Sequence, residues 1–440
     1  MKKGWALIAL CVLILVVGGM PRASYSATVA TTMVDSAVWQ SEVVDSGDGI
    51  GSHLSVAVDP VRGSMYISYY DSTNGDLKAA RYVGSGGNCG IQGSWQCETV
   101  DSAGNVGMYN DIAINPVNGL AGIAYYDAST QSLKVAFGCI GMASCTWITA
   151  TVERGVSGVF SYGVFPSLVY TSDGTAYIAH KIRGLGGDSL QVAYYVGSHG
   201  NCGVDTIAGQ WQCDTVDTGL GVGMYPSLVV DSSNVQHIAY YDSGNNALYY
   251  AKGSLGSYYI YKIVDVAGKF VSMTLDEQHN NTLHMAFYEE STNSLEYAVY
   301  VGTSGNCGFN SNSLHFEWEC SVIDSMGSGQ ADARGIAIAV DADGNPLIAY
   351  GADYALKIAY PASMIGNCGP APNTFYTWMC DTLIPDSIIQ SGEMKYIDIG
   401  INNAGLYTIG YYGGLSTLTG KTSVQAVYQR FPVYLPLTIK

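Results

Sequence analysis

The fold is decided by the stretch Trp95-Gln-Cys-Glu-Thr-Val-Asp101 and by the three segments after it, Val106-Gly-Met-Tyr109, Gly122-Ile-Ala-Tyr-Tyr-Asp127 and Leu133-Lys-Val-Ala136. The same four segments recur as Trp211-Gln-Cys-Asp-Thr-Val-Asp217, Val222-Gly-Met-Tyr225, His237-Ile-Ala-Tyr-Tyr-Asp242 and Leu248-Tyr-Tyr-Ala251. The chain holds seven copies, whose second segments end at Asp59, Asn115, Thr171, Asp231, Asp276, Asp341 and Asn402. One unit is therefore repeated at intervals of 45 to 65 residues.

Each unit predicts one blade of a β-propeller. Its four short segments are rich in Val, Ile, Tyr and Thr and are bounded by turn residues, which is typical of strands. Four strands in roughly 40 to 60 residues are typical of a blade. The chain opens on a lone first segment, Trp39-Gln-Ser-Glu-Val-Val-Asp45, and closes on a lone fourth segment, Val424-Gln-Ala-Val-Tyr428. We therefore predict an all-β, seven-bladed propeller with four antiparallel strands per blade, closed by the N-terminal strand.

The composition agrees with this fold class and excludes two others. Of 440 residues, 12% are charged and 54 are Gly, whereas a typical soluble domain has about 25% charged residues. Such a composition excludes a helical bundle. The net charge of -17 also excludes a protein that binds nucleic acid through a basic face.

The N-terminus has the three parts of a secretory signal peptide. Lys2 and Lys3 precede an apolar run over 5–17, and small residues follow it. The run is shorter than the roughly 20 residues of a membrane span. We predict a signal peptide over 1–27, a linker over 28–37, the propeller over 38–430 and a tail over 431–440. The mature protein is expected outside the cell or at its surface, without a transmembrane segment.

Parts of the repeat resemble a known group of proteins. Pro226-Ser-Leu-Val-Val-Asp231 followed by His237-Ile-Ala-Tyr-Tyr-Asp242 is similar to secreted bacterial propellers related to NHL and BNR-type repeat proteins. The resemblance covers about residues 38–430 and implies the fold. It implies no single activity, because such propellers include lectins, lyases, hydrolases and scaffolds. The Asp-box of sialidases is not intact, since Ser172-Asp-Gly-Thr-Ala-Tyr177 departs from it in spacing.

The ten cysteines that follow the leader form five close pairs. The pairs are Cys89 with Cys97, Cys139 with Cys145, Cys202 with Cys213, Cys307 with Cys320, and Cys368 with Cys380. In a propeller each pair straddles the turn between the third and fourth strands, which predicts five disulfides within blades. Metal binding is the alternative, but zinc sites favour tighter Cys-x2-Cys spacing. We therefore expect no metal and no cofactor.

Acidic residues recur on the face where the second strand of each blade ends. They are Asp45, Asp101, Asp217, Asp265 and Asp324, with Asp71, Asp127, Asp242 and Glu289. Such residues bind cations or sugar hydroxyls in some proteins, and close Asx-turns in many others. The repetition in nearly every blade favours a role in the blade itself.

Aligning the innermost strands gives a column of aromatic residues. It comprises His53, Tyr109, Phe165, Tyr225, Phe270, Gly335 and Tyr396. Strand alternation sets a second column two residues later on the same side: Ser55, Asp111, Ser167, Ser227, Ser272, Ala337 and Asp398. An aromatic ring at a channel mouth stacks on sugars in one interpretation. In the other, the rings pack one blade on the next.

The column just before the aromatic one holds three cations in neighbouring blades. It reads Ser52, Met108, Val164, Met224, Lys269, Arg334 and Lys395. Lys269, Arg334 and Lys395 predict a positive arc that binds a carboxylate or sulfate, with a bidentate contact from Arg334. The favoured alternative is that these side chains turn away and pair with nearby acids.

No catalytic motif stands out, so three hypotheses remain for the function. The sequence lacks a Gly-x-Ser-x-Gly elbow, a His-Glu-x-x-His pair and a Gly-rich phosphate loop. The leading hypothesis is an exported, non-enzymatic propeller that binds glycan or protein. The second is a lyase or glycoside hydrolase acting on acidic glycans, with His53 or His180 in general acid/base chemistry. Blade three departs from the repeat at His180-Lys-Ile-Arg183. The third is a structural surface protein.

Overall fold

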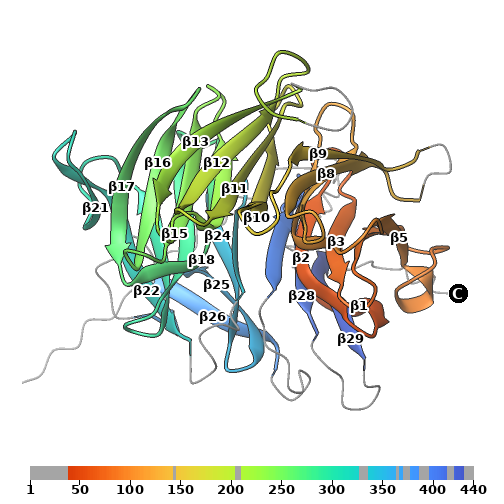
Figure 1. Ribbon diagram of the computed structural model, residues 1–440. Helices are drawn as coiled ribbons and strands as arrows, with labels where there is room; N and C mark the ends of the chain where they lie inside the picture. Colours follow the sequence, from red (N-terminus) through yellow and green to blue (C-terminus); the bar gives the residue numbers. More distant parts are fainter. Residues whose placement is uncertain are drawn as a thin grey trace, which may run out of the picture. The chain divides into compact units, whose positions relative to one another are not determined.

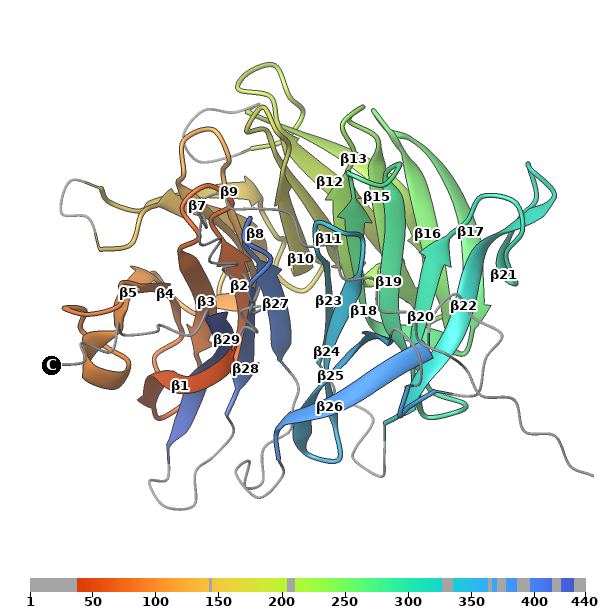
Figure 2. The ribbon, with the colours of Figure 1, turned by 180° about the vertical axis from the view of Figure 1, so that it is seen from behind.

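The seven repeats form seven antiparallel β-sheets arranged in a ring (Figure 1 and Figure 2). The computed structural model describes residues 38–141, 145–203, 210–326, 335–362, 366–369, 377–385, 396–413 and 421–430. All of them belong to one unit, Ala37–Phe431. The expected seven-bladed propeller is confirmed. The expected signal peptide, linker and tail lie outside the described residues and stay predictions.

The strands follow one another from blade to blade. Blade 1 holds β2 (Ile50–Val58), β3 (Met65–Asp71), β4 (Asp76–Tyr82) and β5 (Trp95–Asp101), with a short 3-10 turn, η1 (Ile91–Gly93), before β5. Blade 2 holds β6 (Val106–Ile114), β7 (Ala121–Asp127), β8 (Ser132–Gly138) and β9 (Ile148–Glu153). Blade 3 holds β10 (Phe160–Tyr170), β11 (Ala176–Gly184), β12 (Asp188–Tyr195) and β13 (Trp211–Gly219).

The remaining four blades complete the ring. Blade 4 holds β14 (Met224–Val230), β15 (Gln236–Asp242), β16 (Ala247–Ser254) and β17 (Ser257–Asp265). Blade 5 holds β18 (Ala267–Asp276), β19 (Thr282–Glu289), β20 (Ser294–Tyr300), β21 (Cys307–Asn310) and β22 (His315–Ser325). Blade 6 holds β23 (Ile336–Val340), β24 (Pro346–Ala352), β25 (Ala355–Ala362) and β26 (Thr377–Ile384). Blade 7 holds β27 (Ile397–Ile401), β28 (Tyr407–Tyr412), β29 (Thr422–Arg430) and β1 (Val38–Gly47).

The hydrophobic core lies between neighbouring blades. One cluster joins Val44 and Val424 of blade 7 to Ile67 and Trp95 of blade 1. The second strand of a blade is covered on both sides, and β3 is buried along its whole length. This explains why the third segments of the repeat, which form these second strands, read as nearly continuous apolar runs instead of alternating ones. In the described ranges no helix has the length and hydropathy needed to cross a membrane.

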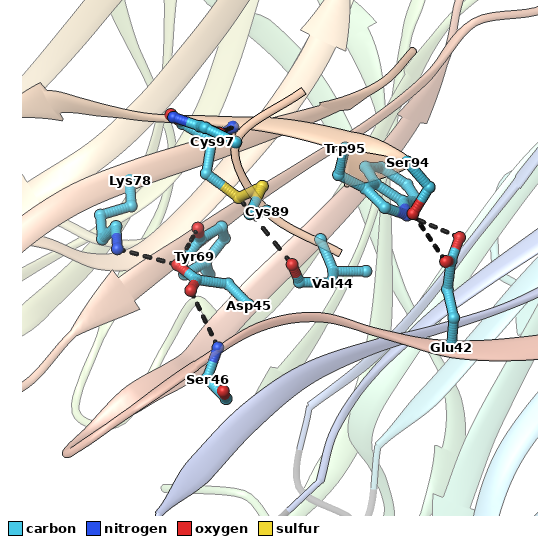
Figure 3. The surroundings of a disulfide bond; sticks show 11 residues. Glu42, Val44, Asp45, Ser46, Tyr69, Lys78, Cys89, Ser94, Trp95 and Cys97 are labelled. Carbon is cyan, nitrogen blue, oxygen red and sulfur yellow. Dashed lines mark hydrogen bonds and ion pairs between the residues drawn. A yellow bond between two sulfur atoms is a disulfide. The ribbon is translucent and has the colours of Figure 1, made fainter. Parts of the chain in front are cut away.

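The N-terminal strand closes the ring, as predicted. Strand β1 pairs antiparallel with β29, from Val38 opposite Arg430 to Gly47 opposite Thr422. It also contacts blade 1 (Figure 3). The Glu42 carboxylate accepts hydrogen bonds from the Trp95 indole (2.8 Å), Ser94 Oγ (2.8 Å) and the Tyr428 hydroxyl (2.9 Å). One side chain of β1 thus joins blade 7 to blade 1.

Five disulfides fasten the hairpins between third and fourth strands. The structure joins the five pairs that the spacing predicts, each within one blade: 89–97, 139–145, 202–213, 307–320 and 368–380. In four of these hairpins the backbone of the first cysteine also pairs, as an antiparallel β-bridge, with the backbone of the Trp in the following strand. Examples are Cys89 with Trp95 and Cys307 with Trp318. The disulfide therefore holds a loop over a buried tryptophan.

Loss of one such disulfide should lower the free energy of unfolding by about 2 to 3 kcal/mol in the chain-entropy model of a short loop. The double variant Cys307→Ser and Cys320→Ser opens the longest of the five loops, with a separation of 13 residues. Guanidinium denaturation of the purified variant measures the change. Peptide mapping without reductant serves as the control, and a link between two blades would contradict the pairing.

Candidate ligand-binding site

The aromatic column lines one cavity on the axis of the propeller. Its volume is about 520 Å³, and all seven column members contribute to the wall: His53, Tyr109, Phe165, Tyr225, Phe270, Gly335 and Tyr396. Each comes from the beginning of the innermost strand of its blade or from the residue just before it. The sequence alignment of the blades therefore brought together the residues of one site.

Six of these side chains touch in a continuous arc. The ring centroids of His53 and Tyr109 lie 4.5 Å apart, and those of Tyr109 and Phe165 lie 4.4 Å apart. The arc continues from Phe165 to Tyr225 at 4.6 Å and from Tyr225 to Phe270 at 4.9 Å. Tyr396 joins its other end at 4.6 Å from His53. The rings pack one blade on the next, as the second interpretation expects, and they also line the cavity. Stacking on sugars stays a prediction.

The arc is built on a repeated backbone bulge. Five of its residues have positive φ, between 51° and 58°: His53, Tyr109, Phe165, Tyr225 and Phe270. The ladder shifts register at each of these points, as between Ser52 and Ser55. Side chains other than glycine rarely adopt this conformation, which costs roughly 1 to 2 kcal/mol per residue. Repeated strain of this kind is typical of a functional site.

Blade 6 interrupts the arc. Gly335 stands in the aromatic column, and a Cβ there would lie 2.6 Å from the backbone nitrogen of Ile397 in blade 7. The close approach of these two backbones requires glycine at this position. The mouth of the cavity is therefore an open arc with one gap.

His53 is the one imidazole among the described residues of the cavity wall. Burial lowers the pKa of His53 to about 4, so the ring is neutral at pH 7. Its Nε2 lies 3.4 Å from the Tyr396 hydroxyl. A neutral imidazole beside a phenol accepts a proton or a hydrogen bond, and does not attract anions.

The second column lies behind the bulge and joins the blades. Six of its seven members accept a hydrogen bond from a backbone N–H of the next blade, and the seventh, Ala337, has no polar side chain. These bonds run from Ile112 to Ser55 (3.2 Å), Leu168 to Asp111 (2.6 Å), Leu228 to Ser167 (3.1 Å), Met273 to Ser227 (2.9 Å), Ile338 to Ser272 (3.2 Å) and Val56 to Asp398 (2.6 Å). The expected alternation fails because the bulge turns His53 and Leu54 both toward the cavity.

The repeated acids have structural partners. Four outer-strand carboxylates accept a hydrogen bond from a tyrosine of the next blade: Asp45 from Tyr69, Asp101 from Tyr125, Asp217 from Tyr240 and Asp324 from Tyr350. Three of them also pair with a lysine: Asp45 with Lys78, Asp101 with Lys134 and Asp324 with Lys357. Asp265 instead pairs with Lys262 of its own strand, 2.7 Å away.

The turn acids cap their own loops. Asp71 accepts the N–H groups of Thr73 and Asn74, each at 3.1 Å, and Asp127 and Asp242 cap the equivalent turns. Glu289 accepts the hydroxyls of Ser291 and Thr292. In the described part of the chain no three metal-ligating side chains form a cluster. These contacts agree with the structural interpretation of the acids.

His180 lies away from the cavity. Its side chain is fully buried on β11, with Nδ1 accepting the N–H of Gly163 at 3.2 Å and Nε2 lying 2.9 Å from Glu153 Oε2. It occupies the place of Tyr69 and Tyr125 in other blades, opposite an outer-strand acid. The structure therefore separates His180 from His53 and gives His180 a contact between blades.

The predicted cation arc is only partly described. Lys269 Nζ lies 3.1 Å from Glu290 Oε2, which agrees with the alternative of pairing with a nearby acid. Arg334 and Lys395 lie outside the described residues, so the arc stays a prediction. Sequence reasoning did not place Arg183 at the cavity. Burial raises the pKa of Tyr109, and the nearby Arg183 guanidinium opposes that rise.

Comparison with known proteins gives similarity of fold. No family model matches the chain, and no curated protein matches it. Similar solved structures include a lectin of Aleuria aurantia in complex with alpha-methyl-L-fucoside, 12% identical with a TM-score of 0.38 over 76% of this chain and 94% of the lectin. Polysaccharide lyase Uly1 is 12% identical, with a TM-score of 0.42 over 88% of this chain and 90% of the lyase. A PL25 ulvan lyase is 10% identical, with a TM-score of 0.41 over 88% of this chain and 95% of the lyase. These similarities carry no argument about activity, and the resemblance to NHL and BNR-type repeats stays a prediction.

Proposed function

We propose that the protein is an exported, non-enzymatic propeller that binds glycan at the axial cavity. The observation that carries the proposal is the arc of six touching aromatic side chains around about 520 Å³. Sugar rings present C–H faces that pack on aromatic rings, while their hydroxyls bond to Tyr and His. The repeated positive φ supports this use, because a plain scaffold does not need strained aromatic residues.

Two further observations support the proposal. The first favours binding over hydrolysis, and the second favours an extracellular location. Among the described residues of the cavity wall none is Asp or Glu, whereas glycosidases commonly use a pair of carboxyl groups. The five disulfides are typical of proteins in oxidising compartments. The proposal includes acidic glycans, because the Arg183 guanidinium acts electrostatically on Tyr109 of the arc.

We expect Tyr109→Ala and Tyr225→Ala each to weaken glycan binding about tenfold or more, since a lost stacking contact of about 1.4 kcal/mol corresponds to that factor. Both rings contact two neighbours in the arc. Calorimetric titration with neutral, polyuronate and sulfated oligosaccharides measures the affinity. The matched control is Phe309→Ala, an exposed aromatic residue on the blade 5 hairpin. Equal affinity in all three variants would contradict the site.

A second candidate function is cleavage of an acidic polysaccharide. The observation that favours it is the neutral His53 imidazole beside the Tyr396 hydroxyl, 3.4 Å apart. A lyase needs a base that takes a proton from carbon and an acid that protonates the leaving oxygen. Product formation from a polyuronate, lost in His53→Ala, would establish this function and exclude the binding-only one. Binding without turnover would exclude cleavage.

A further inference from the structure

A second cavity opens between blades 6 and 7, away from the axial arc. Its volume is about 440 Å³, and Trp39, Tyr360, Asp381, Tyr407 and Gln429 contribute to its wall. We propose that this cavity binds a neutral sugar. The proposal goes beyond the axial site and does not depend on it.

The cavity exists because Trp39 lacks the cover that other outer-strand tryptophans have. Trp95 and Trp318 have no exposed surface, and each forms a bridge with the cysteine of its own hairpin. Trp39 is half-buried. Among the described residues no hairpin joins the third and fourth strands of its blade, because these strands are β29 and β1, from opposite ends of the unit Ala37–Phe431. Its ring therefore contributes to an open wall.

Asp381 stands where blades 7 and 1 carry a longer acid. In these two blades, the outer-strand residue three positions after the Trp contacts the Trp of the next blade. Glu42 of blade 7 accepts from the Trp95 indole at 2.8 Å, and Glu98 of blade 1 lies 3.4 Å from the indole nitrogen of Trp147. At the interface between blades 6 and 7 the equivalent acid is Asp381, one methylene shorter. Its Oδ2 accepts from the Tyr360 hydroxyl instead, at 2.7 Å.

The shorter acid leaves hydrogen-bonding groups open to the cavity. Within the described residues, the Trp39 indole N–H and the Tyr407 hydroxyl have no hydrogen-bond partner. Tyr407 is only 9% exposed, so its hydroxyl is an unpartnered polar group on a buried residue of this wall. Gln429 uses Oε1 to accept the Tyr407 N–H at 3.3 Å, which leaves its amide N–H groups free. The Trp39 N–H and the Tyr407 hydroxyl are not among the fully buried atoms without a partner, so both are open to the cavity. A ligand there takes over the hydrogen bonds that water otherwise makes to them.

The character of the wall selects the class of ligand. Indole and phenol rings provide faces for the C–H groups of a sugar, and the Trp39, Tyr407 and Gln429 donors match its hydroxyl oxygens. Asp381 and Asp341 accept hydrogen bonds from hydroxyl groups. The described wall holds two carboxylates and no Lys, Arg or His, so a uronate or sulfated sugar is repelled. A neutral monosaccharide, or the neutral end of a glycan, fits this chemistry.

The test is titration of the full-length protein with methyl glycosides of glucose, galactose, mannose, fucose, xylose and N-acetylglucosamine. A dissociation constant in the millimolar range is expected for a ligand as small as a methyl glycoside. Asp381→Glu should weaken binding at least tenfold, since the longer side chain reaches the Trp39 indole as Glu42 reaches Trp95. Its melting temperature should not fall. Tyr407→Phe should weaken binding several-fold.

Two control variants show whether the sugar binds in this cavity or elsewhere on the protein. Asp214 follows Trp211 by three positions in blade 3, so Asp214→Glu makes the same change in another blade and should leave the affinity unaltered. Phe309→Ala, an exposed residue outside the walls of both cavities, should also leave it unaltered. A loss of methyl glycoside affinity in Tyr109→Ala alone would assign the sugar to the axial cavity and overturn the proposal. Unchanged affinity in both Asp381→Glu and Tyr407→Phe overturns the proposal. Methylammonium tests whether the two carboxylates of the wall bind a small cation instead: saturation by methylammonium, with no methyl glycoside bound, also overturns the proposal.

Discussion

Deletion of residues 38–46 should remove more stability than any single substitution in the molecule. The deleted strand supplies the fourth strand of blade 7 and the Glu42 contacts with Trp95, Ser94 and Tyr428. An unsatisfied buried polar group costs about 1 to 3 kcal/mol. The deletion leaves three hydrogen-bond donors without an acceptor and exposes the edge of β29. We therefore expect the free energy of unfolding to fall by at least about 5 kcal/mol and the unfolding transition to become less cooperative.

Guanidinium denaturation followed by fluorescence and circular dichroism measures this loss. Glu42→Ala provides the graded comparison, because it keeps the strand and removes only the three side-chain bonds. It should fall between the wild type and the deletion. A deleted protein that unfolds at the wild-type midpoint would show that the ring is closed by another contact.

Asp111→Asn should stabilise the protein above pH 7. Ser55 Oγ lies 2.6 Å from Asp111 Oδ1 and 2.8 Å from Asp398 Oδ2. One hydroxyl has one proton, so the second short contact requires a protonated carboxyl. Burial raises the pKa of Asp398 as well, but the hydrogen bonds that it accepts from the backbone N–H groups of Val56 and Ile399 oppose that rise. Burial and the neighbouring Asp398 charge raise the pKa of Asp111 to about 7. The proton is therefore placed on Asp111.

The sign of the pH dependence follows from this raised pKa. An unfolded Asp has a pKa of about 3.9, so between about pH 4 and 7 the folded state holds a proton that the unfolded state releases. This stability is fully present below pH 4 and is lost as pH rises through 7, on the order of 4 kcal/mol in total. Asn cannot ionise, so Asp111→Asn should be more stable than wild type at pH 8 by about 2 kcal/mol or more.

The matched variant is Asp398→Asn. It replaces an acceptor of three donors by a group with only one oxygen, so it should destabilise the protein by about 2 to 4 kcal/mol. Denaturation curves between pH 4 and 8 measure both variants. Parallel pH profiles for Asp111→Asn and wild type would show that Asp111 is already ionised at pH 4.

The repeat in the sequence was sufficient to predict the architecture and many of the residues that line the axial cavity. Copies aligned on Trp95 and Trp211 predicted seven blades, and the lone segment at Trp39 predicted the closure. The aromatic column followed from the same alignment, because equivalent residues of a closed ring meet on one axis. Local sequence patterns were sufficient for these predictions, because every blade repeats the same pattern of strand pairing.

Interactions between blades were the part that the sequence did not reveal. Strand alternation placed Ser55 beside His53, but a bulge with positive φ at His53 broke the alternation. The available signal was a glycine two positions before each bulge residue, such as Gly51 before His53, because glycine inside a strand often marks a bulge. The protonation of Asp111 also depends on Asp398. These two residues are 287 positions apart along the chain, and Ser55 brings them together only in the closed ring.

The pairing of β1 with β29 sets the mechanical behaviour of the ring. Val38 lies opposite Arg430, so the chain enters and leaves blade 7 at the same end of one antiparallel ladder. Hydrogen bonds in such a ladder run across the strands. A pulling force applied between the two termini therefore loads these bonds one after another, as in opening a zipper. A force directed along the two strands in opposite senses would instead load all bonds of the ladder together, so the closure is weakest against separation of its two ends.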